Sequence, residues 1–301
     1  MSQLPFVSVL TPTYNRRKFI PAAIKCFKAQ SYPQERMEWI ILDDGTDKVE
    51  DLFKASGLKN VRYIALPEKL KIGRKRNLIH EYAKGEICVA WDDDDYYPPD
   101  RVKKAVAKLR SVPNRRVPVV GASELYLYFT DRDQIWAIGP YNPNHCTNGT
   151  MAYWTTYAKE SRYDDEADKA EERSFMKNWT TPVLQLQPQD TMLVMCHNFN
   201  TFDKRKLFGQ NNPRFRQVAI KMRQLVKDKS LRDFYLALGE EYRKMPIQPT
   251  ATEEPPLPAL EPLPEEPPAL TITELPPQEQ QEPPQEKQPQ EQQEPPQPPS
   301  A

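Results

Sequence analysis

Four consecutive aspartates, Asp92–Asp95, are the residues of this sequence best suited to chemistry. They follow the apolar run 87–91 and precede two tyrosines and two prolines. The apolar run is typical of a buried strand, and the prolines end it. Neighbouring carboxylates repel one another unless a positive charge lies among them, and oxygen ligands suit magnesium, manganese or calcium. We therefore expect a divalent cation where this strand leaves a sheet.

Two other expected strands also end in polar residues. Thr11, Thr13 and Tyr14 follow one strand, and Asp43 and Asp44 follow the next. The pattern predicts strands over 6–10, 39–42, 61–64 and 87–91, with helices over 19–30, 49–56 and 73–84 between them. This alternation favours an α/β fold with a mostly parallel sheet, and such sheets bind ligands at the carboxyl ends of their strands. The strand ends thus predict one shared site.

The helix expected from Gly73 begins with cations, among them Lys75 and Arg76. Cations in a first turn oppose the helix dipole, so they favour an anion at that end, such as a diphosphate.

The second half of the chain is less regular. We expect strands over 117–121, 125–130, 151–154 and 192–196, a helix over 167–179 and a basic amphipathic helical region over 215–238. From residue 247 onward the chain holds eleven Glu, one Lys and 17 of its 32 prolines, so this part carries about −10 and the rest about +10. Such a composition predicts a disordered tail.

Four widely spaced cysteines predict a reducing compartment rather than a disulfide framework. The first residues do not resemble a signal peptide, and no apolar run approaches the ~18–20 residues that span a bilayer. We expect a cytoplasmic protein, with peripheral membrane contact through the basic helical region as one option.

Four motifs in order resemble family 2 glycosyltransferases of the GT-A fold. They are Val7–Asn15, Ile41–Thr46, Gly73 with Arg76-Asn77, and Asp92–Asp95. The resemblance implies a Rossmann-like, mostly parallel central sheet flanked by helices. It implies a GT-A domain over 1–245, made of a nucleotide-binding half (1–100), an acceptor-side half (101–205) and a basic helical extension (206–245). The disordered Pro/Glu/Gln-rich tail then covers 246–301.

The resemblance also implies roles at matching positions. Residues that would contact the nucleotide sugar are Thr11, Thr13, Tyr14, Asp43, Arg76, Asp92 and Asp93. Asp94 would bind Mn²⁺ or Mg²⁺, with His197 as a second ligand. An inverting enzyme also needs a general base, and the family's acidic pair corresponds to Glu171-Glu172. We favour Glu172 as the base and keep Glu171 as the alternative.

The expected activity is therefore metal-dependent transfer of a sugar, most simply from a UDP-sugar, to a hydroxyl of a glycan, protein or lipid acceptor. A nucleotidyltransferase on a related fold is one alternative, although residues 11–16 lack its glycine-rich loop. An inactive nucleotide-sugar-binding module is another. Nucleic-acid binding ranks low without a recognition motif. The tail could bind proline-recognising domains.

Overall fold

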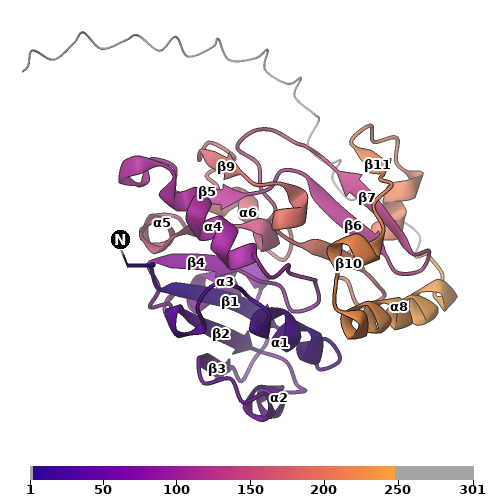
Figure 1. Ribbon diagram of the computed structural model, residues 1–301, viewed down its shortest axis with the longest axis horizontal. Helices are drawn as coiled ribbons and strands as arrows, with labels where there is room; N and C mark the ends of the chain where they lie inside the picture. Colours follow the sequence, from indigo (N-terminus) through magenta and orange to yellow (C-terminus); the bar gives the residue numbers. More distant parts are fainter. Residues whose placement is uncertain (1–2, 248–301) are drawn as a thin grey trace, which may run out of the picture. The chain divides into compact units, whose positions relative to one another are not determined.

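The computed structural model describes residues 3–247, and the predicted tail from residue 248 lies outside them. Two sheets form the framework (Figure 1). The strands are β1 (Val7–Thr13), β2 (Met37–Asp43), β3 (Val61–Ala65), β4 (Ile87–Ala90), β5 (Val119–Gly121), β6 (Leu125–Phe129), β7 (Gln134–Ile138), β8 (Ala152–Trp154), β9 (Val183–Gln185), β10 (Leu193–Cys196) and β11 (Phe215–Gln217).

The first sheet has the order β3-β2-β1-β4-β8-β5-β9, and the second β10-β6-β7-β11. In the first sheet β1, β2, β3 and β4 run parallel, β8 runs antiparallel to both its neighbours, and β5 pairs with β9 in parallel. The predicted α/β fold with a mostly parallel sheet is confirmed. The carboxyl ends of β1, β2 and β4 therefore meet at one edge.

Helices cover both faces of the first sheet. The α-helices of the described residues are α1 (Ile20–Lys28), α2 (Glu50–Ala55), α3 (Ile72–His80), α4 (Arg101–Arg110), α5 (Thr155–Glu160), α6 (Glu172–Phe175), α7 (Met222–Leu225) and α8 (Lys229–Lys244). Short 3-10 helices are η1 (Gln34–Arg36), η2 (Pro113–Arg115), η3 (Asn148–Thr150), η4 (Pro188–Asp190) and η5 (Lys204–Gly209).

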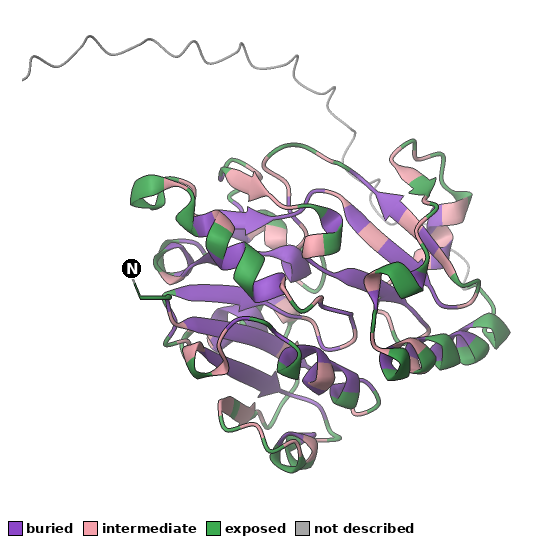
Figure 2. Cartoon of the chain, viewed as in Figure 1, coloured by how far each residue is buried: buried purple, intermediate pink, exposed green. Residues whose placement is uncertain are grey.

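Alternation along the strands explains this layering. Val7 and Val9 of β1 pack with the apolar residues of α1, α2 and α4, whereas Leu10 packs on the other face with those of α3, α5 and α6. Successive strand residues point to opposite faces, so a strand buried on both sides reads as continuously apolar. Figure 2 shows these strands as buried and the outer sides of α4 and α8 as exposed.

The helix predicted over 167–179 was too long, because only Glu172–Phe175 is α-helical. Ala170 on one side and Lys177, Asn178 and Trp179 on the other have positive φ angles. An α-helix of L-residues cannot continue through that region, so the turn geometry limits α6 to four residues.

The helical prediction over 215–238 was wrong at its start. Phe215–Gln217 forms β11, which pairs with β7. Phe215 stacks on Trp136 of β7 with ring centroids 4.7 Å apart. This aromatic contact across the sheet outweighs the local helical pattern. Among the helices of residues 3–247, none is long and apolar enough to cross a membrane.

Candidate functional site

The aspartates leave β4 in a tight turn held by aromatic residues. Trp91 stacks on Tyr97 with ring centroids 3.9 Å apart. The backbone N–H of Asp92 donates to the Tyr97 hydroxyl at 2.8 Å, and that hydroxyl donates to the carbonyl of Gly149 at 3.4 Å. A Cβ added to Gly149 would lie 2.5 Å from Asp92 Oδ2, so a larger residue here would displace the Asp92 carboxylate. Asp92, the first of the four aspartates, is thus held against η3.

The other aspartates point in different directions. Asp95 Oδ1 accepts a hydrogen bond from the N–H of Met195 at 2.7 Å, which ties the turn to the second sheet. Asp93 Oδ1 lies 3.7 Å from Arg16 Nε, and Asp94 Oδ2 lies 3.6 Å from Arg16 Nη2. Arg16 follows β1, so the ends of β1 and β4 do meet.

The two carboxylates beside Arg16 have different protonation behaviour. Burial, and then the charge of Asp94, raises the pKa of Asp93 to about 8. Burial also acts to raise the pKa of Asp94, but the hydrogen bond with His197 and the charge of Arg16 hold that pKa below its usual value. At neutral pH, Asp94 is therefore the ionised member and the better cation ligand.

His197 lies beside Asp94, with Nε2 3.5 Å from Asp94 Oδ2. Its Nδ1 accepts a hydrogen bond from the N–H of Phe199 at 3.1 Å. Burial lowers the pKa of His197, so the ring is neutral. A neutral ring that accepts at Nδ1 carries its proton on Nε2, a tautomer that these partners assign. His197 would have to shift this proton to serve as a metal ligand through Nε2.

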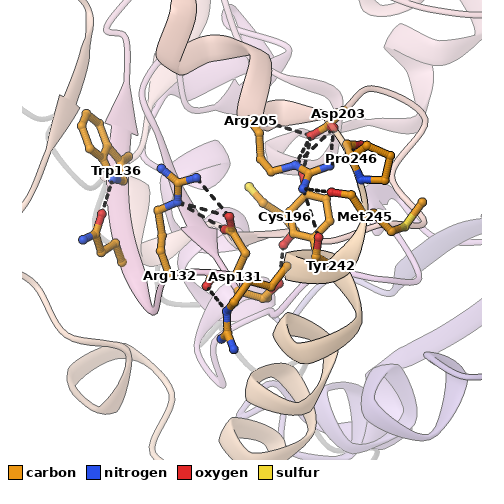
Figure 3. Close-up of polar contacts among 12 residues, drawn as sticks. Asp131, Arg132, Trp136, Cys196, Asp203, Arg205, Tyr242, Met245 and Pro246 are labelled. Atoms are coloured by element: carbon orange, nitrogen blue, oxygen red, sulfur yellow. Dashed lines mark hydrogen bonds and ion pairs between the residues drawn. The ribbon is translucent and has the colours of Figure 1, made fainter. Parts of the chain in front are cut away.

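The segment after His197 is anchored to the end of α8 (Figure 3). Arg205 Nη2 donates to Asp203 at 2.7 Å, and Nη1 donates to the carbonyls of Tyr242 and Met245, each at 3.0 Å. The last carbonyls of a helix lack partners within it, so the guanidinium satisfies them. This contact holds the His197 segment against the domain.

Arg76 joins the cluster to the acidic pair. Its Nε donates to Glu171 Oε1 at 2.7 Å, and its Nη2 donates to Asp92 Oδ1 at 3.2 Å. Asn148 lies on the same guanidinium, and with its amide oxygen toward Arg76 it accepts at 2.9 Å while its nitrogen donates to Tyr163. Arg76 is 9% exposed and so is largely committed to these partners.

Glu172 differs from Glu171 in its electrostatics. Glu171 is buried and paired with Arg76, whereas Glu172 is partly exposed at the start of α6. Burial, and then the neighbouring charge of Glu171, raises the pKa of Glu172 to about 7. A carboxyl that titrates near neutral pH is well matched to general-base catalysis.

The residues after β1 have separate environments. The Thr11 hydroxyl accepts from the indole N–H of Trp39 at 2.8 Å inside the core, so its side chain faces the core. Thr13 Oγ1 is buried and has no hydrogen-bond partner. Tyr14 is partly exposed, and Lys69 Nζ lies 4.4 Å from its ring centroid. Tyr14 is therefore accessible to a ligand, whereas the Thr13 hydroxyl is unpaired but buried.

Asp43 is fully buried and has protein partners. It accepts hydrogen bonds from the N–H of Gly45 at 2.8 Å, from the N–H of Val49 at 3.1 Å and from the Tyr63 hydroxyl. These bonds fix the turn between β2 and α2, which is a structural use of the carboxylate.

At the start of α3, one cation and one backbone donor have partners within the chain. Lys75 forms a buried ion pair with Asp44. The N–H of Gly73 donates to the carbonyl of Ala167 at 3.1 Å. Arg74 is exposed and forms no ion pair within residues 3–247, so an anion at this helix start stays a prediction.

Sequence reasoning missed three residues of this site. Arg16 was visible as the first cation of a basic loop after a strand, and Tyr97 as an aromatic directly after the aspartates. Asn148 carried no local signal. In the described residues, no group of three or more His, Cys, Asp or Glu is arranged to hold a metal ion.

Comparisons with known proteins find similarity to glycosyltransferases. Residues 8–137 match the model of the family described as Glycosyl transferase family 2. Glycosyltransferase AglE of Haloferax volcanii is 25% identical over 199 residues, covering 54% of this chain and 64% of AglE. TarS of Staphylococcus aureus, a poly(ribitol-phosphate) beta-N-acetylglucosaminyltransferase, is 29% identical over 126 residues, covering 37% of this chain and 22% of TarS.

A solved structure shares the fold. Mannosyltransferase PcManGT from Pyrobaculum calidifontis, in complex with GDP-Man and Mn²⁺, has a TM-score of 0.53 and 16% identity, covering 66% of this chain and 59% of that chain. The architecture is thus that of the GT-A class. Over residues 8–137 this chain is similar to glycosyl transferase family 2. It spans only 22% to 64% of the length of the two curated relatives described above.

Proposed function

We propose that this protein transfers a sugar from a nucleotide sugar, with UDP as the favoured nucleotide, to an acceptor hydroxyl with inversion, and that Mn²⁺ or Mg²⁺ assists. The acceptor class is a glycan, protein or lipid. Similarity to glycosyl transferase family 2 supports the reaction type, and the relatives' names and complexes support a nucleotide-sugar donor and a divalent metal.

The observation that carries the proposal is the Arg76 bridge between Asp92 and Glu171. It brings the acidic pair at the start of α6 to the aspartates after β4, although the two lie far apart in sequence. A donor-binding cluster and a carboxyl able to accept a proton thus share one site. An inverting transfer needs this combination.

Two of the residues present, Asp94 and His197, could serve as ligands to a divalent cation. Asp94 is an ionised oxygen donor, and Asp92 and Asp93 are within the same turn. Asp94 would hold the cation, with His197 as a second ligand once Nε2 loses its proton. When bound, the cation supplies positive charge for the departing diphosphate.

The protein's own groups account for the other requirements. Thr13 and Tyr14 line the nucleotide side. Thr11 and Asp43 do not contact the nucleotide in this proposal. Thr11 supports the site from the core, and Asp43 fixes the turn between β2 and α2. Glu172 accepts the proton of the acceptor hydroxyl. The oxygen of that hydroxyl attacks the sugar carbon, and the bond from that carbon to the diphosphate breaks. Glu171 holds Arg76 and keeps the pKa of Glu172 high.

A donor screen tests this proposal. Hydrolysis and transfer of UDP-, GDP- and dTDP-sugars are measured with Mn²⁺, Mg²⁺ or EDTA. We expect activity that depends on the metal, loss of activity in Asp94→Ala, and retained donor binding without transfer in Glu172→Gln. Glu166→Gln, which alters an exposed acid of the same segment, is the matched control.

Full activity in EDTA, or in a folded Asp94→Ala protein, would contradict the metal assignment. Full activity of Glu172→Gln together with loss in Glu171→Gln would transfer the base role to Glu171. No turnover of any donor by the folded wild type would count against the reaction itself.

A further inference from the structure

A second polar pocket lies at the opposite edge of the first sheet. It has a volume of about 490 Å³, and its lining includes Arg115, Arg116, Trp154, Lys177, Thr180 and Thr181. Neither the aspartates nor the acidic pair contributes to this lining. The pocket is therefore separate from the candidate active site.

The strand register gives its location. Trp154, at the end of β8, pairs with Ile87, at the start of β4. Val119 and Val183, at the starts of β5 and β9, pair with each other. The pocket thus lies where these parallel strands begin, whereas Asp92–Asp95 follow the end of β4. The length of β4 separates the two sites.

The lining has an excess of positive charge. It contains Arg115, Arg116 and Lys177, with Glu160 as its acid. Among residues 3–247, neither Arg116 nor Lys177 forms an ion pair. Arg115 has an exposed pair with Glu86 at 3.4 Å, a contact of small energetic value that a ligand can replace.

Aromatic residues hold two of these cations in place. The Arg115 guanidinium lies 4.1 Å from the Trp154 ring centroid, and Lys177 Nζ lies 5.7 Å from that of Tyr157. Trp154 is only 6% exposed, and its indole N–H is a buried donor without a partner. Buried donors are normally satisfied, so this one indicates an incomplete set of contacts.

The backbone on both sides of the pocket is held in an uncommon conformation. Asn114, Arg115, Lys177, Asn178 and Trp179 have φ between 50° and 64°. Residues with a Cβ reach this region at a cost, and such residues cluster at ligand-binding segments. The segments around Arg115 and Lys177 thus both have a strained backbone, and both contribute a cation to the lining of the pocket.

We propose that this pocket binds a phosphate group carried by a small phosphoester or by a phosphate polymer. Arginine guanidinium groups donate paired hydrogen bonds to phosphate oxygens, and lysine adds a point charge at the same wall. The site is independent of sugar transfer, so its test reads binding rather than activity.

The test is calorimetric binding of glycerol phosphate and of short polyphosphate to the full chain, in low salt with EDTA so that metal-dependent donor binding does not contribute. We expect saturable binding that Lys177→Gln and Arg116→Gln each weaken about tenfold, the scale of one charge-assisted hydrogen bond. Lys159→Gln, which removes one exposed charge from neighbouring α5 outside the lining, should leave binding unchanged.

Tighter binding of polyphosphate than of glycerol phosphate would assign a polymer, and equal affinity a small phosphoester. Equal weakening by Lys159→Gln would mean a general field effect and would overturn the proposal. Absence of saturable binding to the wild type at millimolar ligand would do the same. Circular dichroism of each variant confirms folding, and the two independent pocket variants guard against a misfolded one.

Discussion

Replacing Glu171 by Gln should shift the pH dependence of sugar transfer to lower pH. Burial and the charge of Glu171 are the two largest causes of the raised pKa of Glu172, which lies at about 7 instead of the usual 4.5. Gln keeps the shape and an oxygen that still accepts from Arg76 Nε. The substitution therefore removes mainly the negative charge, and the pKa of Glu172 falls.

The magnitude follows from the order of the causes. Burial is the larger cause and remains in the variant. We expect the charge of Glu171 to account for about one pKa unit, equivalent to about 1.4 kcal/mol. The pKa of Glu172 would then fall to about 6.

The assay is the pH profile of kcat/KM, which reports the ionisation of the free enzyme. A general base acts when it is deprotonated, so activity rises with pH through the pKa of Glu172 and then levels off. At pH ~6 the wild type should show about one tenth of its own plateau, and Glu171→Gln about one half. The height of the plateau separately reports the weakened bond to Arg76.

The control is Glu166→Gln, which removes an exposed charge from the same segment and should leave the profile in place. An unchanged or higher apparent pKa in folded Glu171→Gln would refute the assignment of Glu172 as a base whose pKa Glu171 raises. A profile that also moves in Glu166→Gln would show a general charge effect.

Three further outcomes can be measured. The pKa of Glu172 in the folded protein is about 7, so the folded state loses stability as pH rises from about 4.5 through 7. Compared with the wild type, Glu172→Gln should therefore have a Tm higher by about 2–5 °C at pH ~8 and the same Tm at pH ~5. A Tm shift that does not depend on pH would contradict this reasoning. Arg205→Ala removes the hydrogen bonds of Arg205 with Asp203 and the end of α8, which Figure 3 shows. Urea unfolding should show a free energy of unfolding lower by about 2–3 kcal/mol, whereas Lys244→Ala, at an exposed residue, should change it little. A chain ending after Ile247 keeps the contacts of Arg205 with Met245 and Pro246 and should retain kcat. Lost turnover in a folded truncated protein would assign the tail a catalytic role.

Local sequence determined much of the framework. Apolar runs placed β1, β2 and β4, and the polar residues after them marked the functional edge, because both depend on neighbours in sequence. The helix α4 was predictable in the same way from its apolar spacing at Val102, Ala105, Val106 and Leu109, although it was not predicted. The prediction for α6 was too long because turn geometry limits that helix. The residues of β11 were predicted to be helical because the local pattern does not contain the packing between strands.

The sequence by itself determined which residues could do chemistry: the aspartates after β4, the acidic pair and a late histidine. Tertiary structure decided their environments, because partners distant in sequence set their charge and orientation. Arg76 pairs with Glu171 and not with Glu172, so the two acids differ in their electrostatics. The contacts with His197 and Arg16 keep Asp94 ionised. Such contacts depend on how the elements pack, and a linear pattern of residue types does not encode that packing directly.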